Sequence, residues 1–222
     1  MDTSNIIQSV ALYALPVLFA ITVHEAAHGY AARHFGDNTA WKLGRITLNP
    51  LKHIDLFGTI LLPLLLIALS SPFVFGAAKP VPVRFGNLRN PKRDMIWVAL
   101  AGPAANLAMA LVWGSLFYGL SALGISETFF IKMCQGGIAI NVVLFAFNLF
   151  PLPPLDGGRI LVGLLPYRQA ALISRIEPFG IFIVLALSFA TPVIGGFWMQ
   201  PVMSLAYGVI DLILTPLSML VH

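Results

Sequence analysis

Charge and cysteine are both scarce in this sequence. Only 10% of its 222 residues are charged, whereas a soluble domain usually carries about 25%. The single Cys134 cannot form an internal disulfide and indicates little about the redox compartment. The sequence has no internal repeat and no low-complexity run. These absences exclude a soluble globular domain, and the net charge of +4 is better explained by membrane orientation than by nucleic-acid binding.

Apolar runs are abundant instead, since 58% of the residues are hydrophobic. A helix needs about 20 apolar residues to cross the hydrocarbon core of a bilayer. Candidate spans occupy residues 6–30, 95–120, 131–150, 179–195 and 199–221. A sixth run, 56–77, is interrupted by Pro63 and Pro72. The sequence therefore predicts an all-α polytopic membrane protein, with about five transmembrane helices in a single domain over residues 1–222.

The first apolar run contains polar residues where lipid-facing residues are expected. It lacks a basic leader and a small-residue cleavage site, so we expect no cleavable signal peptide. Its "HEAAH" places His24 and His28 on one face of a helix, where the two imidazoles can share a tetrahedral zinc ion. Glu25 can then reach the zinc-activated water as general base. The alternative is a pair of core histidines that only form hydrogen bonds. Three polar groups within a membrane helix are costly, however, and such groups usually mark a functional site.

A catalytic zinc ion needs a third protein ligand at the same membrane depth. Less suitable candidates lie in loops, at the far end of a span or in the last span: Cys134, His34, His53, Glu127 and Asp211. Asp156 is favoured, because prolines break the helix in "NLFPLPPLDGGR" and unwound backbone at membrane depth must line a cavity or lie within protein. Gly157 and Gly158 allow the backbone to approach another group closely. A helix N-cap is the alternative role for Asp156, and the two roles are compatible.

These motifs together resemble the site-2 protease family of intramembrane zinc metalloproteases, in a compact bacterial form. The resemblance rests on HEAAH, AGPAAN (residues 101–106) and FNLFPLPPLDGGR (residues 147–159), with support from GRITLNPLKHID and AAKPVPV in the loops. It covers about residues 10–165, and the last two apolar runs contain no matching motif. The chain departs from larger members of the family in having no room for an inserted PDZ domain or a CBS-like extension.

The resemblance implies a role for each motif residue. One zinc ion per chain would be bound by His24, His28 and Asp156. Glu25 would activate the water, and Asn148 would stabilise the oxyanion at the scissile carbonyl. Asn106 would face the site and contact substrate, with an interhelical hydrogen bond as an equal alternative.

The substrate class follows from the location of the predicted zinc site within the lipid bilayer, where an enzyme meets transmembrane proteins or peptides. A helix hides its carbonyls in hydrogen bonds, so the substrate must unwind, and an exposed strand edge could hold it. "GRITL" has β character, which makes Gly44, Arg45 and Ile46 candidate substrate-binding residues in a small β-like loop region; an ordinary loop is the equal alternative. The predicted function is zinc-dependent hydrolysis of peptide bonds within or near transmembrane segments, as in regulated intramembrane proteolysis.

Basic residues predict the orientation in the membrane. If residues 56–77 are re-entrant or lie against the bundle, only two crossings separate His28 from Asp156 and the ligands can meet. The same arrangement places every lysine and arginine except Lys132 on one side. Positive charge favours the cytoplasm, so we expect an integral protein of the bacterial inner membrane with its active site toward the cytoplasm. The catalytic core would occupy about residues 6–166, and the C-terminal helices about 178–221.

A membrane transporter of metal ions or protons is the alternative function, because intramembrane His, Glu and Asp also line transport paths. Such a protein would more often show internal repeats. Asp211 lies in the last apolar run and belongs to no motif. An interhelical hydrogen bond is the favoured role of Asp211, since no lysine or arginine lies nearby to pair with it. The alternative roles are to line a water path to the zinc ion or to lie in water at the membrane interface. Neither the identity of the substrate nor the oligomeric state follows from the sequence.

Overall fold

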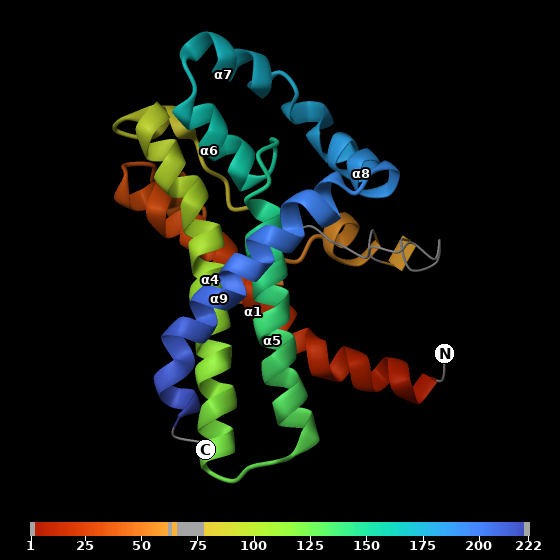
Figure 1. Ribbon diagram of the computed structural model, residues 1–222. Coiled ribbons are helices and arrows are strands. Elements are labelled where there is room, and N and C mark those ends of the chain that lie inside the picture. Colours follow the sequence, from red (N-terminus) through yellow and green to blue (C-terminus); the bar gives the residue numbers. More distant parts are fainter. Residues whose placement is uncertain (1–2, 62–63, 66–77, 220–222) are drawn as a thin grey trace.

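Three long helices form the centre of the protein in a computed structural model that describes residues 3–61, 64–65 and 78–219 (Figure 1). They are α1 (Thr3–His34), α4 (Pro91–Ala122) and α5 (Thr128–Asn148). α4 and α5 run side by side from a short connection at one end, and α1 crosses behind them (Figure 1). The helices predicted in these three regions are confirmed.

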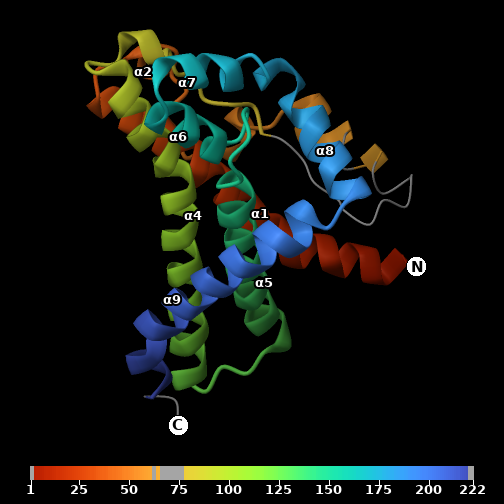
Figure 2. The same cartoon turned by 45° about the horizontal axis from the view of Figure 1, so that its top comes forward.

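Shorter elements occupy both ends of this core. The described residues between α1 and α4 contain α2 (Thr39–Lys42), η1 (Pro50–Lys52), the π-helix η2 (Leu56–Leu61) and η3 (Phe85–Asn87). After α5 the chain forms α6 (Asp156–Leu164), α7 (Tyr167–Ser174), η4 (Glu177–Phe179), α8 (Gly180–Ala190), η5 (Val193–Met199) and α9 (Gln200–Ser218). Figure 2 shows α6 and α7 gathered at the same end as α2, while α9 lies across α4 and α5.

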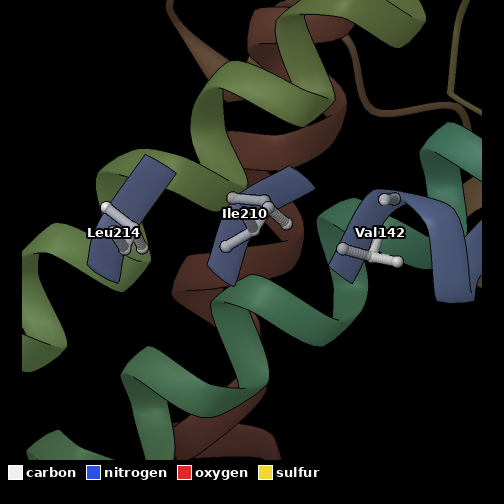
Figure 3. Close-up of a cluster of buried hydrophobic side chains, with 5 residues drawn as sticks. Val142, Ile210 and Leu214 are labelled. Atoms are coloured by element: carbon white, nitrogen blue, oxygen red, sulfur yellow. The ribbon is translucent and has the colours of Figure 1, made fainter. Parts of the chain in front are cut away.

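Small residues allow the helices to approach closely. A Cβ on Gly137 of α5 would collide with the indole ring of Trp113, and one on Gly114 of α4 would collide with Leu214 of α9. Between α4, α5 and α9 lies a buried cluster of Ala110, Val142, Ala206, Ile210 and Leu214, of which Figure 3 labels three. Lipid tails are as apolar as these side chains, so close packing rather than the hydrophobic effect holds the helices together.

The two connections that flank residues 56–77 lie at the same end of the bundle. Arg89 joins the start of α4 to the end of α1, because its N–H donates to the Phe35 carbonyl at 2.9 Å and its guanidinium to the His34 carbonyl at 3.0 Å. The Lys79 N–H likewise donates to the His53 carbonyl at 2.8 Å. The chain thus enters and leaves this interval at one end, as the charge pattern predicts, although residues 62–63 and 66–77 of the expected re-entrant run lie outside the described residues.

A buried carboxylate, Asp37, fixes this end of the molecule. It accepts hydrogen bonds from the Arg84 N–H at 2.7 Å, from the Asn87 amide at 3.1 Å and from the N–H and hydroxyl of Thr39. Burial alone would raise the pKa of Asp37, but these donors hold the pKa below its ordinary value. The depressed pKa contributes stability above the unfolded-state pKa, and that stability is lost as pH falls through the folded-state value.

Two details of the predicted fold are wrong. The expected span at 179–195 is not one helix, because Thr191 is extended before Pro192 and ends α8 after 11 residues, or about 16 Å. Five stretches are nonetheless long and apolar enough to cross a membrane: Ala11–His34, Pro91–Ala122, Thr128–Asn148, Tyr167–Ser188 and Val193–Ser218. The expected β-like loop region at Gly44 to Leu48 forms no strand and begins with Gly44 at a φ of +62°.

Asp211 does not make the interhelical hydrogen bond that was favoured for it. It lies on the exposed face of α9, whereas Ile210 and Leu214 face the bundle. Its carbonyl accepts a hydrogen bond from the Thr215 hydroxyl at 2.7 Å, but its carboxylate has no hydrogen-bond partner among the described residues.

Candidate metal centre

The two histidines of HEAAH lie buried on the face of α1 that packs against α4. His24 is 8% exposed and His28 is 9% exposed. They face Gly102 of α4, where any Cβ would lie within 3.0 Å of both imidazole rings. Helix periodicity therefore aligns the rings, and the absence of a side chain at Gly102 makes room for them.

Hydrogen bonds fix the orientation of both rings. His28 Nδ1 lies 2.7 Å from the Val98 carbonyl, and His24 Nδ1 lies 2.6 Å from Asn106 Oδ1. A carbonyl oxygen only accepts, so each Nδ1 carries the proton and donates it. The Nε2 atom of each ring is then left as the unprotonated nitrogen that binds a metal.

Asp156 reaches the histidines because the chain turns sharply after α5. A Cβ on Gly157 would collide with the backbone of Leu149 and Phe150, and one on Gly158 would collide with the backbone of Leu152 and Pro153. Only glycine at these two positions lets the loop fold back on itself at the start of α6. Asp156 is the first residue of α6, whose N-cap is Leu155, so the alternative N-cap role for Asp156 is not adopted.

Three potential ligand atoms form a nearly equilateral triangle. His24 Nε2 and His28 Nε2 are 3.0 Å apart, and each lies 3.3 Å from Asp156 Oδ2. Tetrahedral zinc with bonds of about 2.0–2.1 Å has ligand atoms about 3.3 Å apart. Asp156 Oδ2 is also buried and has no hydrogen-bond partner among the described residues. A buried carboxylate oxygen facing two unprotonated nitrogens fits a divalent cation.

A second layer of buried amides extends behind His24. The Asn106 amide nitrogen donates to the Ala20 carbonyl at 3.2 Å and to Asn141 Oδ1 at 3.0 Å, and the Asn141 amide donates to the Gly137 carbonyl at 2.8 Å. Both asparagines are 0% exposed. The network links α1, α4 and α5 and sets which side of the Asn106 amide faces His24. In this arrangement the Asn106 side chain is used within the protein, which favours the interhelical alternative over substrate contact.

Glu25 lies beside the triad on α1. Its Oε2 accepts a hydrogen bond from the Val81 N–H at 2.7 Å. The side chain is partly exposed, unlike the three buried residues of the triad. Glu25 is thus separate from the ligand triangle, with one oxygen held by the loop that precedes α4.

The remaining predicted residues lie outside the ligand triangle. Asn148 ends α5, and its amide donates to the Leu144 carbonyl of the same helix at 3.0 Å. Arg45 contacts the segment that carries Val81, since its guanidinium donates to the Lys79 carbonyl at 3.0 Å. Ile46 packs over Gly29 of α1, whereas the carbonyl of Gly44 meets the Lys52 ammonium at 3.4 Å on the surface.

Comparison with known proteins identifies the family of the chain. A sequence model of peptidase family M50 matches residues 125–191. "Putative zinc metalloprotease YwhC" of Bacillus subtilis is 40% identical over 86% of this chain and 84% of its own length. The chain belongs to peptidase family M50. "Putative zinc metalloprotease Rip2" of Mycolicibacterium smegmatis is 32% identical over 84% of this chain and 71% of its own. No solved structure matches significantly.

Membership of the M50 family confirms the resemblance to site-2 proteases that the motifs indicate. The protein is an integral-membrane zinc metalloprotease, and the described residues contain one group suited to hold the zinc ion, His24, His28 and Asp156. The membrane is indicated by five apolar helices and by the family.

Sequence reasoning missed several residues that shape the site. Asn141 is one of them, although an asparagine within an apolar span was a visible signal. The sequence marks Gly102 only as part of AGPAAN, and the contact of Gly102 with both histidines has no signal of its own. Nothing in the sequence indicated that the N–H of Val81 or the carbonyl of Val98 would be used.

Proposed function

We propose that this protein cleaves peptide bonds within or near the transmembrane segments of membrane proteins. The observation that carries the proposal is the depth of the buried triad. Gly102, which packs against both histidines, lies about 16 Å along α4 from its start at Pro91. A site at that depth in a bundle of apolar helices would meet chains in the bilayer rather than soluble ones. Regulated intramembrane proteolysis is the process that such a site would serve.

The chain's own residues have distinct roles in this proposal. His24, His28 and Asp156 hold zinc, which when bound polarises the scissile carbonyl and makes water more acidic. Glu25 takes a proton from the water as the new C–O bond forms, and returns it to the leaving nitrogen as the C–N bond breaks. Asn148 donates a hydrogen bond to the oxyanion. These residues fall within about 6–166 of a single domain that we assign to residues 1–222.

Gly44, Arg45 and Ile46 remain the proposed contacts for an unwound substrate. Their support is proximity, since Arg45 and Ile46 lie against the segment that contacts Glu25 and against Gly29, one turn after Glu25 on α1. The N–H groups of Gly44 and Arg45 donate to the Trp41 and Ala40 carbonyls, so the backbone of Ile46, which has no hydrogen bond to a described residue, is the part that can pair with an extended peptide.

Activity on a membrane-inserted substrate tests the proposal directly. Purified protein in liposomes should hydrolyse single-span peptides from a library of varied sequences, and mass spectrometry should place the cuts within or beside the span. A chelator should stop the cleavage and added zinc should restore it. Soluble peptides that carry the same scissile sequence serve as the matched control. Cleavage of the soluble peptides alone would contradict the proposed substrate class.

We further propose the inner membrane as the location, with the site toward the cytoplasm. Single cysteines replacing Lys42 or Arg89, in a Cys134→Ala background, should react with an impermeant maleimide only after bacterial cells are permeabilised. A cysteine replacing Lys132 should react in intact cells, because α5 begins at the opposite end of the bundle (Figure 1). All three positions are exposed. Labelling of positions 42 and 89 from opposite sides would contradict the proposed topology.

A further inference from the structure

An extended segment rich in proline, Lys79 to Val83, lies against α1 beside the metal centre. We refer to these five residues, Lys-Pro-Val-Pro-Val, as the strap. The Val81 side chain is 6% exposed, and the Val81 N–H donates to Glu25 Oε2 at 2.7 Å. The strap therefore touches the proposed general base through one backbone group.

The close approach of the strap depends on Gly29. Gly29 follows Glu25 by one helical turn and lies on the same face of α1. A Cβ at Gly29 would lie 3.1 Å from Val81 Cγ1 and 2.9 Å from Ile46 Cγ1. An alanine at this position would force the Ile46 side chain to shift and would press closely on the Val81 side chain.

Both ends of the strap are held independently of Glu25. The Lys79 N–H donates to the His53 carbonyl at 2.8 Å, and Arg45 donates to the Lys79 carbonyl at 3.0 Å. At the other end the Arg84 N–H donates to Asp37 Oδ2 at 2.7 Å. The strap does not need its bond to Glu25 as an anchor, since these contacts fix its course on either side.

The prolines restrict which backbone donors the strap can offer. Proline has no N–H, so Pro80 and Pro82 leave the Val81 N–H as the only donor in the interval between them. That donor faces a carboxylate oxygen at 2.7 Å, which is the short distance of a charge-assisted hydrogen bond.

We propose that the Val81 N–H is a positioning group for Glu25. By holding Oε2, it limits rotation of the carboxylate and leaves Oε1 as the oxygen that receives and returns the proton. The strap would thus couple the loops at the basic end of the bundle to the orientation of the base. This inference rests on the proposed role of Glu25 as general base, and it assigns a function to the strap that the metal ligands do not explain.

Removal of this one N–H tests the proposal. Val81→Pro deletes the donor, and Val83→Pro is the matched control, because the Val83 N–H makes no hydrogen bond to any described residue. Val81→Pro should lower kcat about 10- to 100-fold, while KM and zinc content stay within about twofold of wild type. Val83→Pro should keep wild-type kcat.

A double-mutant cycle separates positioning from a purely structural role. In the Glu25→Gln background, where no base remains to be oriented, Val81→Pro should change residual single-turnover hydrolysis by less than about twofold. A further loss of 10-fold or more there, or a loss of zinc in Val81→Pro alone, would overturn the proposal by showing that the strap supports the fold.

A backbone ester at Val81, introduced with the α-hydroxy analogue of valine, removes the N–H and keeps the side chain. It should reproduce the fall in kcat even if Val81→Pro folds poorly. Unchanged kcat in the ester protein would overturn the positioning role alone. Full turnover in Glu25→Gln would instead overturn the assignment of the base, so the two failures are distinguishable.

Discussion

Replacing Glu25 with glutamine should leave zinc bound and reduce turnover about 100- to 10,000-fold, the usual contribution of a general base. Glu25 does not belong to the ligand triangle, so its loss leaves His24, His28 and Asp156 in place. The glutamine carbonyl can still accept the Val81 N–H that Glu25 Oε2 accepts at 2.7 Å. The change therefore removes only the ability to take a proton. Zinc content by atomic emission and kcat on a single-span peptide are the two measurements.

Asp156→Ala is the matched comparison for Glu25→Gln. It removes one corner of the triangle, whose Oδ2 lies 3.3 Å from both histidine nitrogens, and it should lose zinc and activity together. Substantial turnover in Glu25→Gln would show that Glu25 is not the base. A Glu25→Gln protein that lost its zinc would show instead that Glu25 helps to bind the metal.

The central fold could be predicted because membrane spans follow from composition alone. The apolar runs at 95–120 and 131–150 correspond to α4 and α5, since about 20 apolar residues have few alternatives in lipid. The run at 179–195 gave a wrong helix, because a proline inside an apolar run either kinks or ends a helix and tertiary packing decides which. At Pro192 the chain ends α8 and starts a π-helix that leads into α9.

The metal ligands could be predicted for a different reason. His24 and His28 lie one turn apart, which fixes their relation without any knowledge of the fold. The prediction of Asp156 depends on membrane depth and on the basic residues, which place the loops before α4 on one side of the membrane. The hydrogen bonds of Arg89 to the end of α1 agree with that placement. The resemblance to a known family supplied the roles of Glu25 and Asn148, which remain proposals.

The layer behind the ligands could not be predicted from the sequence. The 2.6 Å contact of His24 with Asn106 joins residues of two different helices, and the contact of Asn106 with Asn141 adds a third. Such pairs depend on helix rotation and crossing angle, which side-chain packing sets across the whole bundle. The approach of Val81 to Glu25 could not be predicted either, because the strap is positioned by contacts with residues distant in the sequence, Asp37, His53 and Arg45.

The Gly102→Ala variant should bind zinc about 10- to 100-fold more weakly than wild type. A Cβ at this position would lie within 3.0 Å of His28 Nε2, His28 Cε1 and His24 Cε1. To make room for this Cβ, the imidazole rings must move. They then lose either the 3.0 Å spacing of their Nε2 atoms or the Nδ1 hydrogen bonds to Asn106 and Val98. Competition with a fluorescent zinc chelator measures the affinity.

Gly119→Ala is the matched control, because Gly119 lies on the same helix and a Cβ there would meet nothing within 4 Å. Alanine favours a helix over glycine by about 1 kcal/mol, so α4 should stay helical in both variants and Gly119→Ala should bind zinc as wild type does. Equal zinc affinity in the two variants would contradict the close packing of α4 on the histidines. If Gly102→Ala loses zinc affinity and Gly119→Ala does not, metal binding depends on a residue that offers no ligand. The reason is that the two imidazoles, which face Asp156, occupy the space that a side chain at position 102 would fill.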